Sequence, residues 1–443
     1  MLARRCAAAA ASAVACLFAA HALAGAQEGD AALDRGDYAA ALAEYRPAAE
    51  AGDPQAQVGM STLYSDGLGV KQDDRVAVQW LRQAAAKNNA RAKALLGMAY
   101  GNGKGVAHDD VESFRWFNMA AVQGDALGRY GIGYAYFSGL GVLQDQTLAC
   151  QLFLQSANQG EREAMSKIGY CYDVGQGMPK DHAVAIGWYR RGAALGVKDA
   201  LYKLGYALEE GYDGPPDPAA AAVQYQRAAD LGMSFAQNSL GVLYDRGSGV
   251  PHDPARAVAL YLLAAAQEND VAQDNLGKKY LTGDGVPRDI AIARDWFLKS
   301  AAHGNEKAAG FLGSIYAGGY GPSFADPVLA EKWTRIAANK GNPFAQYRMG
   351  EFYRSGAGVA ADPAQAVEWY RKAAANGQLY ALLRLAAAYH DGIGVDTDEV
   401  AACDWIRQAA QAIKPMSAAS AAASPEVAAY RAAAKRNCTM TLL

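Results

Sequence analysis

Hydrophobic positions along the chain follow a helical pattern that returns at a nearly constant interval. In a typical copy an Ala is followed four residues later by Leu, Ile or Met and, four later again, by Tyr, as in Ala236, Leu240 and Tyr244. This spacing places the three side chains on one face of a helix. The Tyr position recurs every 36 residues, with one interval of 37, at Tyr64, Tyr100, Tyr136, Tyr172, Leu208, Tyr244, Tyr280, Tyr316, Tyr353 and Tyr389. Such a period predicts one repeat array rather than several separate domains.

A second helix is predicted in every repeat by an Asp that follows the Tyr position after nine residues, or ten in the longest copy. Asp caps the first turn of a helix by accepting hydrogen bonds from its free amides. The set is Asp73, Asp109, Asp145, Asp181, Asp217, Asp253, Asp289, Asp326, Asp362 and Asp398, and Pro218, Pro254, Pro327 and Pro363 follow at the first helical position. All seven tryptophans share one position of this helix: Trp80, Trp116, Trp188, Trp296, Trp333, Trp369 and Trp405. A Gly in the left-handed conformation is expected where the helix ends, as at Gly160.

A Gly-x-Gly-Val segment joins the two helices of most repeats, as in Gly67–Val70. A single copy could be mistaken for a phosphate-binding loop, but no strand is predicted before it and it recurs between two helices. We therefore interpret it as a structural turn that carries one apolar side chain.

These motifs resemble the Sel1-like repeat family, a subfamily of tetratricopeptide-type helical repeats, over roughly Ala31 to Gln411. Leu240–Val250 and Trp369–Gly377 carry the resemblance most fully. It implies an all-α fold, an α/α solenoid (superhelix) of about ten 36-residue helix-turn-helix repeats plus terminal caps. It also implies that the first helices line the concave surface. The local departures are Leu208 and the turn Gly211–Pro216 in repeat five, and Leu152 in place of Trp in repeat three.

The chain start is typical of an export signal. Arg4 and Arg5 precede an apolar run from Cys6 to about Ala20, and small residues allow cleavage near residue 24 or 26. The alternatives are an uncleaved anchor, for which the run is short, and a lipoprotein acylated at Cys16. We therefore expect a signal peptide at 1–26, a half repeat or cap at 27–53, ten repeats at 54–412, an Ala/Ser linker at 413–423 and a capping helix with tail at 424–443. The expected location is periplasmic or secreted, without a membrane span after cleavage.

Four cysteines remain once the signal has been removed. Cys150 and Cys171 lie at equal distances from a predicted helix–helix turn near Gly160, so they are expected at the same height on two antiparallel helices and to form a disulfide. Cys403 occupies the position equivalent to Cys150, which leaves Cys438 as its partner and would attach the terminal helix. The alternative for both pairs is buried free thiols.

Composition and motifs argue against several function classes. The net charge of −3 provides no basic field for nucleic acid, so no nucleic-acid partner is expected. The serine motifs of β-lactamases, with which some secreted members of the family have been associated, do not occur. The histidines share no metal-ligand spacing. We therefore assign no catalytic residue, no metal and no cofactor.

A binding surface is better supported. Six and two residues before the Tyr position, side chains point away from the apolar face of the first helix. In repeats three to five these positions hold tyrosines, with lysines beside them: Tyr130, Tyr134, Lys167, Tyr170, Tyr202, Lys203 and Tyr206. On a concave face they would form a tyrosine-rich groove with cationic edges, suited to a peptide or a glycan. The alternative is that some pack against the next repeat. A weaker second candidate consists of Tyr347, Arg348 and Arg384.

We thus expect a non-enzymatic periplasmic or secreted scaffold that binds a protein or peptide on its concave surface. Cell-envelope assembly, exopolysaccharide regulation and host interaction are contexts that the resemblance suggests without choosing among them. The alternative functions are a peptidoglycan- or glycan-binding protein that uses the same groove and, with less support, a weak β-lactamase-like enzyme.

Overall fold

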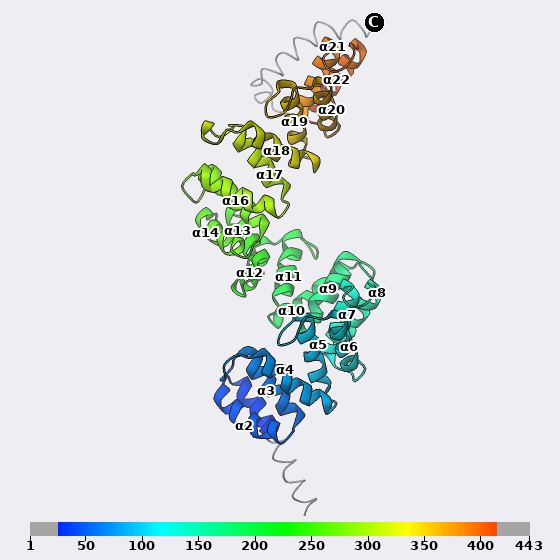
Figure 1. Ribbon diagram of the computed structural model, residues 1–443, viewed down its shortest axis with the longest axis vertical. Coiled ribbons are helices and arrows are strands. Elements are labelled where there is room, and N and C mark those ends of the chain that lie inside the picture. Colours follow the sequence, from blue (N-terminus) through cyan, green and yellow to red (C-terminus); the bar gives the residue numbers. More distant parts are fainter. Residues whose placement is uncertain (1–24, 414–443) are drawn as a thin grey trace, which may run out of the picture. The chain divides into compact units, whose positions relative to one another are not determined.

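The computed structural model describes residues 25–413, and these residues form a succession of antiparallel helix pairs (Figure 1). Residues 25–34 are helical and are followed by α2 (Tyr38–Glu50). The first helices of the ten repeats are α3 (Pro54–Asp66), α5 (Ala90–Asn102), α7 (Ala126–Ser138), α9 (Arg162–Val174), α11 (Lys198–Glu210), α13 (Ser234–Arg246), α15 (Asp270–Thr282), α17 (Glu306–Tyr316), α19 (Pro343–Ser355) and α21 (Leu379–Asp391). The second helices are α4 (Asp74–Ala86), α6 (Asp110–Ala121), α8 (Gln146–Asn158), α10 (His182–Ala194), α12 (Pro218–Asp230), α14 (Pro254–Ala265), α16 (Ile290–Ala302), α18 (Pro327–Asn339), α20 (Pro363–Ala375) and α22 (Glu399–Ile413).

The helix boundaries lie where the repeated Asp and Gly residues predict them. Each of the ten repeated aspartates accepts a hydrogen bond from a backbone amide in the first turn of the second helix. Gly160, after the end of α8, has a φ of 94°, the left-handed conformation expected there. Local sequence therefore determines where these helices begin and end.

The chain divides into two compact units, up to Ala228 and from Ala229 onward. Within each unit the cores are small clusters between adjacent helix pairs, such as Phe153 with Ile168 in the first unit and Tyr261 with Leu276 in the second. Each tryptophan of the shared position packs against one of these clusters or belongs to it. The core is therefore distributed along each unit, as nearest-neighbour packing in a repeat array requires.

The residue after the tryptophan position reaches deepest into each core. Tyr189, Tyr225, Tyr261, Phe153 and Phe297 are among the largest fully buried side chains. In most repeats its ring lies against a Gly three residues before the Tyr position of the first helix. At Gly241 an added Cβ would be 2.7 Å from the Tyr261 ring. This glycine therefore allows the two helices of one repeat to approach closely, a role that the sequence pattern did not reveal.

The Gly-x-Gly-Val segments are structural turns, as predicted. Gly103 ends α5 with a φ of 64°, and Gly105, with a φ of 70°, lies directly against the Asp74 carbonyl of the preceding repeat. The turns of repeats five and eight differ. In repeat five the Tyr212 ring packs against His182, with 4.0 Å between the ring centres. In repeat eight α17 is only 11 residues long, and the longer connection contains the 3-10 helix Pro322–Phe324.

Three predictions concern residues outside the described range. They are the signal peptide, the C-terminal capping helix with most of the linker before it, and the Cys403–Cys438 disulfide, because Cys438 lies beyond residue 413.

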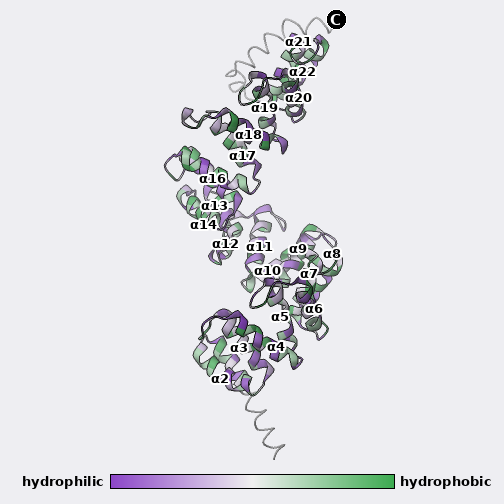
Figure 2. Cartoon of the chain, in the orientation of Figure 1, coloured by the Kyte–Doolittle hydropathy of each residue, from purple (hydrophilic) through white to green (hydrophobic). Residues whose placement is uncertain are grey.

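Hydrophilic and hydrophobic residues are interspersed along the described helices (Figure 2). In residues 25–413 no helix combines the length and the apolar character needed to cross a membrane.

Candidate binding surface on the first helices

The tyrosines and lysines predicted to bind a partner lie on three successive first helices of the first unit. Tyr130 and Tyr134 are on α7, Lys167 and Tyr170 on α9, and Tyr202, Lys203 and Tyr206 on α11. First helices of consecutive repeats touch each other directly, as α5 does with α7 and α9 with α11. In a curved array this is the arrangement expected of the inner side, where the helices are closer together.

The lysines join the tyrosines of neighbouring repeats. The Lys167 Nζ is 5.6 Å from the centre of the Tyr134 ring, and the Lys203 Nζ is 5.2 Å from the centre of the Tyr170 ring. Both distances fall within the range of a cation–π interaction. We call Tyr134, Lys167, Tyr170, Lys203 and Tyr206 the tyrosine–lysine face.

Exposure separates the predicted tyrosines into two groups. Tyr134 is 40% exposed and Tyr206 is 38% exposed, so both can contact a partner. Tyr130 lies 5.8 Å from Phe153, and Tyr202 lies 5.7 Å from Tyr225, measured between ring centres. Burial, followed by the charge of Glu163, raises the pKa of Tyr130.

The packing of Tyr130 and Tyr202 follows from their helical position. Each lies three residues before the Gly that receives the buried ring of the second helix, Gly133 for Tyr130 and Gly205 for Tyr202. Residues three apart are neighbours on a helix surface. These two tyrosines therefore pack against the core ring of their own repeat, and the face is formed mainly by the residues nearer the end of each first helix.

Aromatic residues that the sequence analysis did not select extend this face. The rings of Phe137 and Tyr170 meet edge to face, with 6.0 Å between their centres, and the rings of Tyr206 and Tyr212 do the same at 6.0 Å. Burial, followed by the charge of Asp173, raises the pKa of Tyr212 to about 12. Tyr212 lies in the irregular turn of repeat five, and that irregularity was the signal that could have identified it.

A His–Asp pair borders Tyr212. Asp173 contacts the His182 Nδ1 at 3.0 Å and accepts a hydrogen bond from the Tyr189 hydroxyl at 3.3 Å. Burial, followed by the charge of Asp173, raises the pKa of Tyr189. This arrangement fixes the His182 ring beneath Tyr212, so the face ends in a rigid aromatic contact rather than in a free loop.

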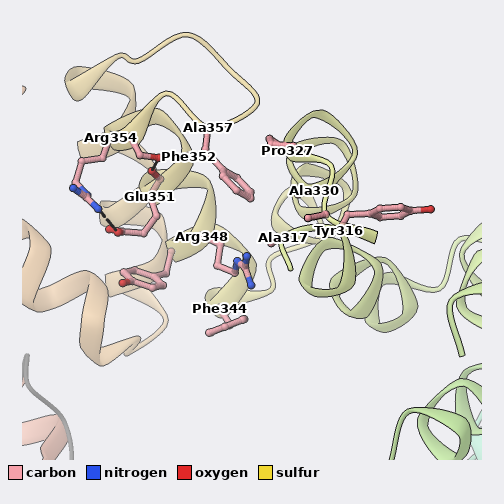
Figure 3. A pocket seen from close by; sticks show the side chains of 13 residues that line it. Tyr316, Ala317, Pro327, Ala330, Phe344, Arg348, Glu351, Phe352, Arg354 and Ala357 are labelled. Carbon is pink, nitrogen blue, oxygen red and sulfur yellow. Dashed lines mark hydrogen bonds and ion pairs between the residues drawn. The ribbon is translucent and has the colours of Figure 1, made fainter. Parts of the chain in front are cut away.

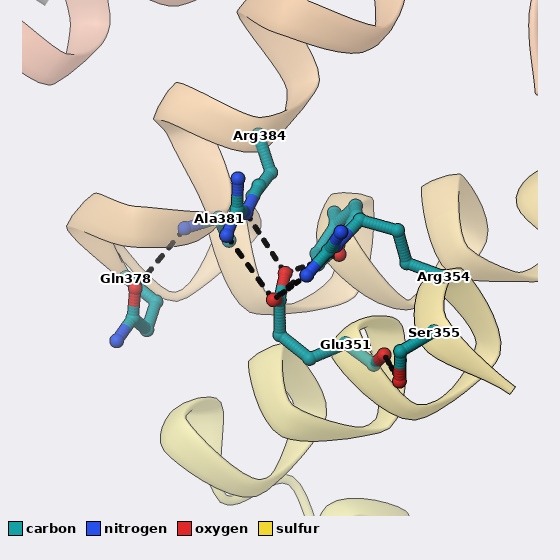
Figure 4. A network of polar contacts seen from close by, with 7 residues as sticks. Glu351, Arg354, Ser355, Gln378, Ala381 and Arg384 are labelled. Carbon is teal, nitrogen blue, oxygen red and sulfur yellow. Dashed lines mark hydrogen bonds and ion pairs between the residues drawn. The ribbon is translucent and has the colours of Figure 1, made fainter. Parts of the chain in front are cut away.

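The second candidate, Tyr347, Arg348 and Arg384, lies on α19 and α21 of the second unit. Arg384 is paired with a carboxylate: its Nε and a terminal nitrogen donate to Glu351 at 2.8 and 3.1 Å. Arg354 also donates to Glu351 at 2.8 Å, and the Tyr370 hydroxyl donates at 2.5 Å. Figure 4 shows the two arginines converging on this carboxylate. Arg384 is therefore part of a structural network, whereas Arg348 lies apart from it.

The disulfide expected between Cys150 and Cys171 is present. It joins α8 to α9, with 6.1 Å between the Cα atoms. Both half-cystines are fully buried in the cluster that also contains Phe153. The bridge therefore ties α8 of the third repeat to α9 of the fourth, the helix that also carries Lys167 and Tyr170.

Clusters of metal-ligating side chains are absent from the part of the chain that the structure describes. Residues 25–413 contain no group of three or more His, Cys, Asp or Glu side chains placed to hold a metal ion. Single pairs such as His390 with Glu399, at 2.6 Å, lie on the surface. The tyrosine–lysine face itself consists of aromatic rings and ammonium groups on successive first helices.

The Sel1 repeat model matches the chain in ten consecutive segments, at residues 54–89, 90–125, 126–161, 162–197, 198–233, 234–269, 270–305, 307–342, 343–378 and 379–412. No curated protein matches the chain. Among solved structures, it is similar to c5321, a protective antigen of uropathogenic Escherichia coli with an SLR fold, at 31% identity over 92% of this chain and 90% of that one, with a TM-score of 0.67. It is also similar to a Sel1 repeat protein of Oxalobacter formigenes, at 31% identity over 65% of this chain and 89% of that one, with a TM-score of 0.46.

Proposed function

The chain belongs to the Sel1 repeat family, and we propose that it is a non-enzymatic scaffold that binds a protein or peptide partner on its tyrosine–lysine face. Proteins of this family generally act as scaffolds for protein–protein interaction. The observation that carries the proposal is the stacking of Lys167 on Tyr134 and of Lys203 on Tyr170, on helices of successive repeats. A surface with the same contact one repeat apart suits an extended polypeptide that crosses the repeats.

The chemistry of this face favours a polypeptide over a substrate to be transformed. Tyrosine offers a large contact area and a hydroxyl at low entropic cost, which is why it is common at interaction hot spots. The lysines add positive charge, so acidic or carbonyl-rich segments of a partner are favoured. A glycan remains the alternative ligand, since sugars also stack on aromatic rings.

We place the mature protein in the periplasm or outside the cell. The buried Cys150–Cys171 disulfide supports an oxidising compartment, and the similar E. coli protein is a protective antigen. The charged and apolar segment at the start of the sequence has the composition of an export signal. A role in envelope or exopolysaccharide processes is the context that fits this location.

The test is capture of a partner from envelope extract by purified protein. The variant Y134A/Y170A/Y206A removes the three rings of the face, and V111A/V122A/L143A removes exposed apolar side chains elsewhere, at 64%, 81% and 91% exposure. We expect the first variant to lose a specific partner by at least tenfold and the second to retain it, with equal helicity. Unchanged capture by the first variant would reject the proposal. Loss of co-sedimentation with purified peptidoglycan instead would assign the face to a glycan.

A further inference from the structure

A separate cavity lies where the array is least regular, between repeats eight and nine. α17 ends at Tyr316 without the glycine cap found on the other first helices, and the chain then takes a longer path to α18. The resulting pocket has a volume of about 440 Å³ and lies between this connection and α19 (Figure 3). This volume falls in the range of small-ligand pockets, roughly 300–1,000 Å³.

The wall of the pocket is mainly apolar and aromatic, and it holds one cation, Arg348, that forms no ion pair with a carboxylate of residues 25–413. Tyr316, Ala330, Phe344 and Phe352 supply apolar surface. Arg348 extends from α19 toward Ala317 on the opposite wall (Figure 3). Its guanidinium carbon is 5.9 Å from the Phe344 ring centre and 5.8 Å from the Phe352 ring centre.

The carboxylate nearest in the sequence does not neutralise Arg348. Glu351 is the acidic residue that lines the pocket, and it binds Arg354, Arg384 and the Tyr370 hydroxyl. Within residues 25–413 no carboxylate forms an ion pair with Arg348. The lining of the pocket therefore contains two arginines, Arg348 and Arg354, and one glutamate, and it carries an excess of positive charge.

Burial makes this cation receptive to an anion. Desolvation lowers the pKa of Arg348, with the tyrosine hydroxyls of Tyr347 and Tyr320 acting in the opposite direction. An arginine still remains charged at neutral pH, so it retains the cost of partial desolvation without a partner. A ligand carboxylate would form two parallel hydrogen bonds with the guanidinium and offset that cost.

We propose that this pocket binds an acidic peptide segment, with the ligand carboxylate on Arg348 and a neighbouring apolar side chain against Phe344 and Phe352. A peptide is favoured over a bare anion because the greater part of the wall is apolar. Phosphate or acetate would leave this apolar surface exposed to water, whereas a peptide side chain would cover it. The site is separate from the tyrosine–lysine face, because its lining residues lie between Tyr316 and Ala357. Either site can therefore fail its test without the other.

The proposal can be tested by titrating the full-length mature protein with acetyl-Phe-Glu-amide and with its neutral counterpart acetyl-Phe-Gln-amide. Binding is followed by the chemical shift of the Arg348 Nε–H and, for the variants, by the backbone amides of α19. We expect the acidic peptide to bind at least about tenfold more tightly, the ratio for one charge-assisted hydrogen bond of about 1.5 kcal/mol. R348Q should abolish this preference, and F344A should weaken both peptides alike.

Three controls make the result decisive. R75Q removes an exposed arginine in the other unit and should leave both affinities unchanged. Circular dichroism establishes that R348Q is folded, and R348K, which keeps the charge without the planar fork, should give an intermediate preference. Equal affinity for the two peptides, or a preference that persists in R348Q, would overturn the proposal. Sodium acetate or phosphate binding as tightly as the acidic peptide would overturn the assignment to a peptide.

Discussion

The Lys203 ammonium lies over the Tyr170 ring at 5.2 Å, and Arg384 stands in the same structural relation to Glu351. In both pairs the cationic residue follows its partner by 33 residues, so the contact joins one first helix to the next. Lys167 over Tyr134 repeats this arrangement at 5.6 Å, and Lys278 over Phe311, at 5.8 Å, has the cation on the earlier helix and the ring on the later one. The same pair of positions on neighbouring first helices is therefore occupied by a cation–π pair in some repeats and by an ion pair in another, while the repeat fold around it is the same.

This relation predicts a measurable coupling between Lys203 and Tyr170. Because the pair is partly exposed, the cation–π contact should contribute about 0.5–1 kcal/mol. A double-mutant cycle with K203M and Y170L, measured by hydrogen exchange of α9 and α11, should return a coupling of that size. The pair Lys198 and Tyr170, on the same helices but not in this relation, should give no coupling. A coupling below about 0.2 kcal/mol between Lys203 and Tyr170 would show that their contact does not contribute to stability.

A second prediction concerns the glycine that faces the buried ring of each repeat. In G241A the new methyl group would lie 2.7 Å from the Tyr261 ring and 3.3 Å from the Ala257 carbonyl oxygen. Overpacking of this kind costs about 1–3 kcal/mol, so α13 and α14 should lose hydrogen-exchange protection. The matched change G187A, on α10 with no atom within 4 Å of the new methyl group, should stabilise its helix by about 0.5–1 kcal/mol. Similar effects for the two variants would contradict this explanation.

A third prediction concerns the disulfide that joins α8 to α9. Cys150 and Cys171 are separated by 21 residues, and closing a loop of about this size contributes roughly 3 kcal/mol. C150S/C171S, or reduction of the native protein, should therefore lower protection in α8 and α9 while helices of the second unit keep theirs. Peptide mapping without reductant should recover the linked pair as well as the predicted Cys403–Cys438 pair. Free thiols at Cys150 and Cys171 in protein purified without reductant would refute the first bridge.

The repeat framework was predictable because each of its signals is local. Asp253, for example, caps α14 through an amide three residues away, and this needs no knowledge of tertiary structure. The Cys150–Cys171 pairing was predictable for a related reason: symmetry about one turn sets the heights of two adjacent helices. Period and capping residues together thus determine the helix pairs.

The less predictable features depend on the offset between repeats. Tyr130 and Tyr202 pointed away from the apolar face by helical geometry, yet both pack against a ring that enters beside Gly133 or Gly205. Arg384 was predicted to contact a ligand, but it forms an ion pair with Glu351 of the previous repeat. The pattern within one repeat does not show that residues 33 apart meet on neighbouring first helices. The pairing of Arg384 with Glu351, which leaves Arg348 outside that network, could therefore not be deduced from it.

The last prediction concerns pH and the Glu351 network. Burial alone would raise the pKa of Glu351, but hydrogen bonds from Arg354 and Tyr370 and the charge of Arg384 outweigh burial and lower it. A carboxylate with a lowered pKa in the folded state stabilises the fold fully above its unfolded pKa of about 4.3. That stability is lost as the pH falls through the folded-state pKa. The helices α19, α20 and α21 should therefore lose protection below about pH 4.

The variant E351Q isolates this contribution. At pH 7 the substitution should lower the free energy of unfolding by about 1–3 kcal/mol, because two arginines lose a shared, half-buried anion. The loss of hydrogen-exchange protection in α19–α21 at acid pH should also become shallower. E368Q is the matched control, since Glu368 pairs with Arg371 at the surface with its side chain 55% exposed, and exposed pairs contribute about 0–1 kcal/mol. If E351Q and E368Q have the same pH profile as the native protein, Glu351 does not hold these repeats together. A shallower profile in E351Q alone would show that one carboxylate links three consecutive helices through its arginine and tyrosine partners.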